Sequence, residues 1–506
     1  WYDAAANWQH DKDGREFSSA PIEKLFLLAT LKFATRDPYG MGIEYEAGKP
    51  GWNDAMNGLP GMVGSGMPET YELEVMLKYI RSVVARYERS MSIPVELGVL
   101  LEEIASALET LGKSGYTDDG KLSADVPAGL FEYWDTVATA REKYREATKI
   151  TFSGKIQTLT PNMAGDYLDK WMEQVQAGKA RAIDIGRGES GQDGIAPTYF
   201  AFNVTEWTNA AGKSDEHHNL VLPLAMRVMN FPMFLEGPTR VMKTLERRSD
   251  AKATYELVRQ SALRDNTLNM YTVSASLKGQ SFDMGRMMAF TPGWLENESV
   301  WLHMSYKFYL ELLRAGLYRQ FFDEMSSGML PFISSDQYGR SPMECSSFIA
   351  SSAFEDPSVR GRGFLARLSG ATAEFLSMWV LMMIGPSPFS LDGDTKQLQM
   401  RLAPTLPMAF FDGTVGTNNP DLIRQRRDEK IEEGAPVPTI SFKLFSSIIV
   451  TYHNPEMRDL LGEPPKRYEV GLRDGSREEI DGPTIPSDLA VKIRRVVFVD
   501  TIDAYF

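Results

Sequence analysis

The residues with the clearest chemical potential lie in one stretch, from Gly48 to Glu72, which contains Trp52, Asn53 and Asp54. Six glycines and three prolines surround this triplet, a density that predicts a loop with imposed backbone dihedrals. An indole can stack on a sugar ring, and an apolar neighbour keeps a carboxyl group protonated near neutral pH. The stretch therefore indicates general acid chemistry on a carbohydrate, and the alternative is an ordinary glycine-rich turn.

A second segment, from Phe290 to His303, reads FTPGWLENESVWLH and leads into an apolar pattern that predicts a helix. Glu296 and Asn297 lie at the mouth of that helix, where free backbone N–H groups and the helix dipole favour an anion. His303 lies just inside it. Two interpretations stay open: an anion or substrate site, or a helix cap followed by a histidine whose hydrogen bonds are satisfied in the core.

A third segment brings small and hydroxyl residues to the start of the most apolar predicted helix. Gly361-Arg362-Gly363 leads to Ser369 and Gly370, and Thr372 follows. Glycine backbone N–H groups and a hydroxyl are suitable donors for an oxyanion. The segment indicates either a phosphate-binding turn or a simple glycine turn into a core helix.

The first segment resembles a known catalytic loop. Residues 51–57 read GWNDAMN and are similar to the DWNDGMN loop of the cellobiose phosphorylase family of inverting glycoside phosphorylases. The resemblance implies that Asp54 is the general acid and that Trp52 and Asn53 bind substrate. Gly51 replaces the first Asp of that pattern. The longer wording, PGWNDAMNGLPG followed by GSGMPET, is more similar to the related β-1,3-oligoglucan phosphorylases.

The second segment resembles the ENGGxxxH run of the same family. The match implies that Glu296 and Asn297 contact substrate and that His303 donates to the attacking phosphate. Glu298 and Ser299 stand where the family pattern has two glycines, so the shape of this loop is expected to differ.

The third segment resembles the family run GRGGWTWYTGS, whose Thr-Gly pair binds phosphate. Ser369 takes the position of that Thr and keeps the hydroxyl, and Gly370 keeps the close backbone approach. The resemblance thus implies that both residues bind phosphate, and Thr372 is expected to contact substrate.

Length and charge bound what the chain can be. It has 506 residues, 43% hydrophobic and 24% charged content, and a net charge of −14. This length predicts more than one domain. The acidic balance argues against a nucleic-acid or anionic-membrane partner, since either needs a basic face. The single cysteine, Cys345, excludes an internal disulfide.

The chain opens with Trp1 rather than Met, without the basic and apolar regions of a secretory signal. We therefore expect a processed protein or the C-terminal portion of a longer one. The longest apolar run, from Phe375 to Ile384, is too short for a bilayer, which needs about 20 residues. It is interpreted as a buried core helix.

Apolar spacing predicts many helices before Gly385 and short strands after it. Helices are expected at Pro21–Phe33, Tyr71–Arg89, Ser92–Leu111, Gly129–Arg145, Met163–Val175, Val221–Arg248, Lys252–Leu263, Ser299–Met325 and Phe364–Ile384. A strand is expected at Thr198–Trp207, inside a small insertion at about 180–215. Later strands are expected at Leu398–Leu402, Thr439–Phe445, Ser447–Tyr452, Arg467–Leu472 and Val496–Val499, with an exposed loop at Asp421–Glu433.

This order suggests a mainly α fold, an α/α barrel at 1–385 capped by a C-terminal β-sandwich at 386–506. The family resemblance implies an (α/α)6 catalytic barrel with a jelly-roll-like C-terminal domain. The expected reaction is inverting phosphorolysis of a β-linked gluco-oligosaccharide, with β-1,3-glucan favoured. One proton donor beside groups that hold an anion favours phosphate, rather than activated water, as the nucleophile. Two alternatives stay open: an inverting hydrolase with Glu296 or Glu298 as base, and a non-catalytic carbohydrate-binding or assembly subunit.

No cofactor beyond phosphate as co-substrate is expected. His217 and His218 lack further ligands at metal spacing. Glu44 and Glu46, just before the loop, are either ligands of an acceptor sugar or solvated charges. The resemblance implies a homodimer in the cytoplasm.

Overall fold

The computed structural model describes residues 8–111, 122–186, 194–214, 219–366, 370–414 and 438–506. Its internal contacts divide the chain into two compact units. The first unit comprises Trp1–Thr267, Tyr271–Trp301 and Ala350–Arg360, and the second comprises Leu268–Met270, Leu302–Ile349 and Gly361–Phe506. Each unit therefore combines segments that are distant in the sequence.

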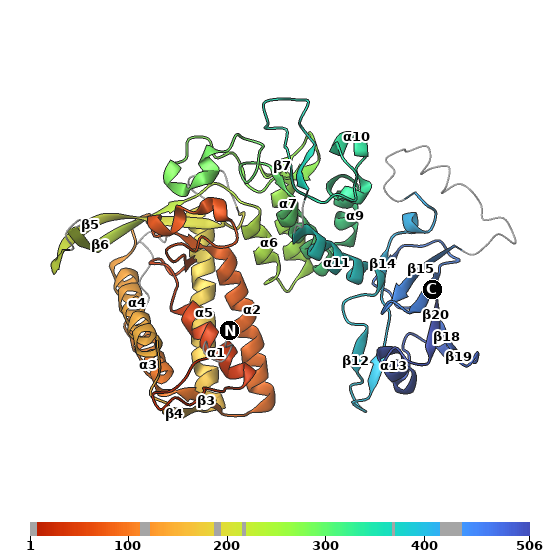
Figure 1. Cartoon of the computed structure of the whole chain (residues 1–506), viewed down its shortest axis with the longest axis horizontal. Coiled ribbons are helices and arrows are strands. Elements are labelled where there is room, and N and C mark those ends of the chain that lie inside the picture. Colours follow the sequence, from red (N-terminus) through yellow and green to blue (C-terminus); the bar gives the residue numbers. More distant parts are fainter. Residues whose placement is uncertain (1–7, 112–121, 187–193, 215–218, 367–369, 415–437) are drawn as a thin grey trace, which may run out of the picture. The chain divides into compact units, whose positions relative to one another are not determined.

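Long helices form the body of the first unit. They are α1 (Pro21–Phe33), α2 (Met67–Tyr87), α3 (Val95–Leu111), α4 (Ala128–Thr148) and α5 (Pro161–Gly186). Helix α1 packs on α2, α2 on α5, and α3 on α4, and Figure 1 shows these helices running side by side. A ribbon of β3 (Met91–Pro94) and β4 (Ile156–Leu159) closes one end. The shorter helices α6 (Glu236–Met242) and α7 (Arg248–Gln260) follow.

The core of these helices is apolar and aromatic. Trp171 on α5 is fully buried, and its ring stacks on Phe33 of α1 with centroids 5.1 Å apart. Leu77 and Ile80 on α2 are also fully buried in this core. The 3.6-residue apolar period of the sequence thus fixes which faces meet.

A small sheet holds both ends of the Trp52 loop. It is formed by β1 (Ile43–Glu44), β2 (Ser65–Gly66), β5 (Tyr199–Ser214) and β6 (Asn219–Asn230), in that order. Ile43 pairs with Gly66, and Glu44 pairs with Ser65. Because β1 precedes the loop and β2 follows it, their pairing fixes the distance between the loop's two ends.

The helix predicted at Val221–Arg248 is wrong in its first half. Residues 219–230 are β6, which pairs antiparallel with β5. The apolar residues of this strand recur at every second position (Leu222, Leu224, Met226 and Val228), which is the period of a strand. The run resembles a helix only in its total apolar content. The strand predicted at Thr198–Trp207 is confirmed by β5.

The second unit begins with helices α8 (Leu302–Arg314), α9 (Tyr318–Gly328) and α10 (Ser335–Tyr338). The single helix predicted at Ser299–Met325 is therefore wrong. The chain leaves α8 after Arg314, and Gly316 adopts a left-handed φ of +72°, a conformation that glycine adopts without steric cost. The change of direction lets α9 pack back on α8.

The region predicted as one helix at Phe364–Ile384 starts as strand β11 (Gly363–Ala366), which pairs with β10 (Ser346–Ile349). Helix α11 (Gly370–Met383) follows and packs on α8. The expectation that this helix lies deep in the core is also wrong, because Leu376, Trp379 and Val380 are exposed. Across the described ranges, no helix combines the length and the apolarity needed to cross a membrane.

A five-stranded sheet forms the C-terminal part of the second unit. Its strands, in spatial order, are β15 (Thr439–Leu444), β16 (Ile448–His453), β20 (Val499–Tyr505), β18 (Arg467–Leu472) and β19 (Arg477–Asp481). Strands β16 and β20 are parallel, and the other pairs are antiparallel. The strands predicted at Thr439–Phe445, Ser447–Tyr452 and Arg467–Leu472 are confirmed, while Asp421–Glu433 lies outside the described residues.

The remaining elements are short. They are the strands β7 (Arg264–Asp265), β8 (Met270–Tyr271), β9 (Val300–Trp301), β12 (Phe389–Leu391), β13 (Leu398–Met400), β14 (Thr405–Leu406) and β17 (Leu460–Leu461), the helix α13 (Ser487–Arg494), and the 3-10 helices η3 (Leu59–Met62), η4 (Phe282–Met284), η5 (Arg286–Ala289), η6 (Leu330–Phe332) and η7 (Met408–Phe410).

The predicted fold class, a mainly α barrel with a jelly-roll-like β-sandwich, is wrong. Helices account for 42% of the described residues and strands for 22%, and these strands are divided among many small sheets. Short strands and the β5–β6 hairpin interrupt the helices of the first unit, so its helices do not follow one another as simple hairpins. In the described C-terminal residues the largest sheet is mixed and has five strands, whereas a jelly roll pairs two antiparallel sheets.

The packing of α2 yields a stability prediction. Leu77→Ala removes a fully buried side chain, so we expect it to lower the free energy of unfolding by about 2–5 kcal/mol. Leu224→Ala is the matched control, because Leu224 is 54% exposed and its loss should change stability by less than about 0.5 kcal/mol. Urea unfolding of both variants measures the difference, and equal effects would contradict the assigned core.

Candidate functional site

The Trp52 loop presents Asp54 on a short, capped turn. Asp54 is the first residue of the 3-10 helix η2 (Asp54–Met56), and the Asn53 side chain accepts a hydrogen bond from the Ala55 N–H at 3.2 Å. Asn53, Ala55 and Met56 are buried, while Asp54 is exposed. The buried neighbours thus hold the turn in place and leave the Asp54 carboxyl in contact with solvent.

The loop is also held at its far end. The Gly58 N–H donates to the carbonyl of Met284 at 3.2 Å, and the Asn57 side chain accepts from the Arg286 N–H at 3.0 Å. Ala55, Met56 and Met284 belong to one small hydrophobic cluster of the first unit. The position of Asp54 is therefore set by contacts on both sides of it.

Asp54 lines a cavity of about 470 Å³. This volume lies within the range of small-molecule sites. We call it the Asp54 cavity. Its walls include many polar and charged side chains, and they come from the end of α1, from β1, from the loop and from the start of α2: Lys32, Thr35, Ile43, Glu44, Tyr45, Glu46, Gly48, Lys49, Pro50, Gly51, Asp54 and Glu69. Such walls offer many hydrogen-bonding groups to the hydroxyls of a sugar.

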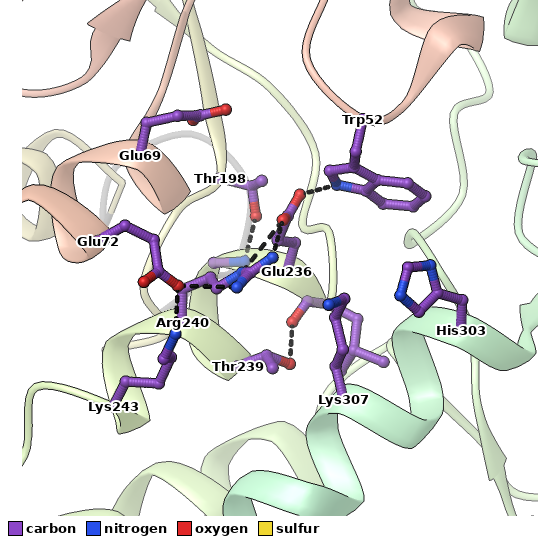
Figure 2. Close-up of polar contacts among 12 residues, drawn as sticks. Trp52, Glu69, Glu72, Thr198, Glu236, Thr239, Arg240, Lys243, His303 and Lys307 are labelled. Atoms are coloured by element: carbon purple, nitrogen blue, oxygen red, sulfur yellow. Dashed lines mark hydrogen bonds and ion pairs between the residues drawn. The ribbon is translucent and has the colours of Figure 1, made fainter. Parts of the chain in front are cut away.

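Trp52 is fixed by a hydrogen bond from its indole N–H to the buried carboxylate of Glu236 (Figure 2). Glu236 is the first residue of α6, and the adjacent Gly237 N–H donates to the Thr198 hydroxyl at 2.9 Å. The indole is therefore tied to the start of a helix that is itself fastened to the β5 region.

The Glu236 carboxylate continues into a row of alternating charges. Arg240 lies 3.3 Å from Glu236 and 2.7 Å from Glu72 of α2, and Lys243 lies 2.5 Å from the same Glu72 oxygen (Figure 2). Opposite charges at these distances favour the ionised forms, and the pKa of Glu72 is lowered even though burial acts to raise it. The row links α6 to α2.

A second cavity of about 650 Å³ lies against this row. Trp52, Glu236 and Arg240 line it, together with the apolar side chains of Leu73 and Met76. Lys32 and Glu69 line both this cavity and the Asp54 cavity. The two hollows are thus neighbours, and an extended ligand has room on both sides of Glu69.

The pKa of the Glu69 carboxyl lies well above its ordinary value. The Tyr45 hydroxyl lies 3.1 Å from each of its carboxylate oxygens. Burial, followed by the negative charge of Glu236, raises the pKa of Glu69 to about 7. Burial also raises the pKa of Glu44 to about 7, although Arg141 and the Trp134 indole act to lower it. Two walls of the Asp54 cavity can therefore hold a proton near neutral pH.

Glu296 and Asn297 lie in a tight turn of the first unit. The Asn297 side chain donates to the Phe290 carbonyl at 2.8 Å, and Leu295 and Glu298 have left-handed φ angles of +49° and +58°. Helix α8 begins only at Leu302, so the expectation that Glu296 and Asn297 lie at its mouth is wrong. Glu298 and Ser299 replace the glycines of the family pattern, yet Glu298 still takes the left-handed conformation.

Two of the residues predicted for the first unit have a buried side-chain amide atom without a hydrogen bond. Within the described chain, Asn53 Nδ2 and Asn297 Oδ1 make no hydrogen bond. Buried polar atoms in folded proteins are almost always paired. Both residues were predicted from the sequence as substrate ligands.

In the second unit the structure brings His303 and Gly370 together. His303 is the second residue of α8 and Gly370 is the first of α11. A Cβ added to Gly370 would lie 2.5 Å from His303 Nε2, so only glycine allows this approach. Thr372 is exposed in the first turn of α11, and Ser369 lies outside the described residues.

The predicted site residues thus fall into two groups. Those of the first unit are Trp52, Asn53, Asp54, Glu296 and Asn297, and those of the second are His303, Gly370 and Thr372. Sequence reasoning missed Glu69 and Glu236. Glu69 follows Pro68 at the start of α2, which is a helix-start pattern and carries no sign of an active role. Glu236 has no local signal, because its importance comes from Trp52, which is distant in the sequence.

Among the described residues, no group of three or more His, Cys, Asp or Glu side chains is arranged to hold a metal ion. Comparison with protein-family models and with curated proteins gives no significant match for this chain. The case for a function therefore rests on the site itself and on the resemblance of the three segments.

Glu69 yields a pH-dependent prediction. Its pKa is raised from 4.5 to about 7, so its contribution to stability is complete below pH 4.5 and is lost as the pH rises through 7. In the wild type, the free energy of unfolding should fall by on the order of 3 kcal/mol over this range because of Glu69, and Glu69→Gln abolishes that fall. Urea unfolding at pH 5 and pH 7.5 should show a smaller pH effect in the variant than in the wild type. Glu146→Gln, at an exposed position, is the control and should leave the pH effect unchanged.

Proposed function

We propose that this protein catalyses the reversible, inverting phosphorolysis of β-linked gluco-oligosaccharides and releases α-glucose 1-phosphate. The observation that carries the proposal is the exposed Asp54 carboxyl on a capped turn, at the wall of a cavity of about 470 Å³. A preference for β-1,3-linked glucans is inferred from the sequence of the loop around Trp52, which resembles that of the β-1,3-oligoglucan phosphorylases.

Asp54 acts as the general acid in this mechanism. Its proton passes to the glycosidic oxygen as the bond between that oxygen and C1 breaks. A phosphate oxygen forms the new bond to C1 from the opposite face, which converts the β linkage into an α-phosphate. Phosphate is already an anion and a nucleophile, so the forward reaction requires no second carboxylate to activate it.

The loop residues support this role through position and charge. Asn53 caps the turn and limits the movement of Asp54. Trp52, held by Glu236, offers an aromatic edge to a sugar bound in the second cavity. The Glu44 and Glu69 carboxyls have pKa values of about 7. Each can therefore donate a hydrogen bond to a sugar hydroxyl or accept one from it.

Phosphate binding is assigned to His303, Ser369 and Gly370. The support from the described residues is the close approach of the His303 ring to the Gly370 backbone at the start of α11. A helix N-terminus favours a bound anion. Glu296, Asn297 and Thr372 are assigned to the substrate.

Asp54→Asn tests the acid. We expect the variant to lose phosphate-dependent release of glucose 1-phosphate from a β-1,3-gluco-oligosaccharide by about 10²–10⁴-fold, because the amide cannot donate the required proton. The thermal unfolding midpoint should stay close to that of the wild type, since Asp54 is exposed. Asp135→Asn, at another exposed aspartate of the first unit, is the matched control. Near-normal turnover by Asp54→Asn would refute the assignment.

Inverting hydrolysis is a second candidate, and one observation favours it. Glu69 lines the same cavity as Asp54, and a second carboxylate is what a hydrolase uses to activate water. Product analysis with and without phosphate separates the two reactions. Glucose 1-phosphate formed only with phosphate supports the phosphorylase, whereas free sugar formed equally in both conditions supports the hydrolase.

A further inference from the structure

Three titratable side chains meet where α8 and α11 pack together in the second unit. Lys307 Nζ lies 2.8 Å from Glu374 Oε1, and His303 Nε2 lies 3.6 Å from the same oxygen. His303 and Lys307 are one turn apart on α8, as Figure 2 shows, and Glu374 comes from the first part of α11. We call this group the His303 cluster.

The geometry of the cluster brings its nitrogen donors to one point. His303 Nε2 and Lys307 Nζ both face Glu374 Oε1, so the Glu374 carboxylate keeps the two nitrogens close to each other. The side chains of His303, Lys307 and Glu374 are 31%, 22% and 16% exposed, so each is partly shielded and still reachable from solvent. An ammonium group has three N–H donors, and Glu374 takes one of those of Lys307.

The acidic member of the cluster, Glu374, is ionised. Burial acts to raise the pKa of Glu374, but its interactions with His303 and Lys307 outweigh burial and lower the pKa to about 2. Glu374 is therefore ionised throughout the physiological range. A phosphate carries up to two negative charges near neutral pH, so a site that presents His303 and Gly370 alone would supply little compensating charge.

A purely structural role for the pair makes a different prediction. If Lys307 and Glu374 only fastened α8 to α11, their removal would lower the stability of the chain without altering its interaction with anions. Partly exposed ion pairs of this kind contribute little to stability. The location beside His303 and at the start of α11 is what points to an additional role.

We propose that Lys307 is a further phosphate-binding residue and that Glu374 is the positioning residue that holds Lys307 and His303 together beside the start of α11. This inference rests on the proposed phosphorolysis. Lys307 would supply the charge that His303 and the backbone of Gly370 do not, and Glu374 would fix the direction from which that charge approaches.

The test measures binding of inorganic phosphate to the full chain by isothermal titration calorimetry, without sugar. Lys307→Met should weaken binding by about 10- to 100-fold, because a charge-assisted hydrogen bond is lost. Lys307→Arg should restore part of the affinity, because it keeps the charge. Glu374→Gln should weaken binding less than Lys307→Met does, since the donors remain but are no longer held together.

Arg314→Met is the matched control. It removes a cation from the same helix, where Arg314 pairs with Glu311 at 2.6 Å, and it should leave phosphate affinity unchanged. In turnover assays, Lys307→Met and Glu374→Gln should raise the KM for phosphate and leave the KM for the glucan within about twofold. Thermal unfolding of each variant verifies that it is folded.

The outcomes separate this inference from the proposed function. Normal phosphate affinity in Lys307→Met overturns the inference, even if the wild type releases glucose 1-phosphate. Phosphate binding that depends on Lys307 in a chain that forms no sugar phosphate supports the anion site and refutes the phosphorylase. A wild type that binds no phosphate overturns both.

Discussion

The hydrogen bond from the Trp52 indole to Glu236 is the constraint on which the first-unit site depends. Trp52 lies on a loop rich in glycine, and the loop has little regular structure of its own between β1 and β2. Glu236 is buried and belongs to a helix, so it supplies a fixed point. Because Arg240 and Glu72 continue from Glu236 to α2, the position of the indole is linked to the helical core, and Asp54 is carried on the same loop.

Burial near Glu236 disfavours the ionised form of the neighbouring carboxyl groups, and Glu72 and Glu69 respond to this differently. Glu72 is compensated by cations, which keep it ionised. Burial raises the pKa of Glu69 to about 7, the negative charge of Glu236 adds to the rise, and the hydrogen bond from the Tyr45 hydroxyl only partly opposes it. Neighbouring carboxyl groups thus differ in protonation because their surroundings differ. This arrangement is typical of functional sites, where titratable groups are moved away from their ordinary ranges.

The sequence predicted local elements better than their assembly. The amphipathic period placed α1 at its observed bounds and α4 within a few residues, because each helix buries one continuous apolar face. It failed at Val221–Arg248, because Leu222 and Leu224 belong to a twofold apolar alternation, which is the period of a strand. It failed for the fold class because the pairing of short strands such as β2 with β5 depends on contacts between distant segments. The loop with Asp54 was indicated by residue types alone, whereas Glu69, Glu236 and Lys307 contact residues that are distant in the sequence, and no local pattern reveals such contacts.

The β5–β6 hairpin has a consequence of another kind. Among the described residues, β5 pairs with β2 at Tyr199 and Phe200 and otherwise only with β6. Trp207 on β5 and Leu222 on β6 are largely exposed. Backbone amides in a two-stranded ribbon are protected by a single layer of hydrogen bonds and little packing. Deuterium from heavy water should therefore enter this hairpin well before it enters the β16–β20 pair, which lies inside a five-stranded sheet.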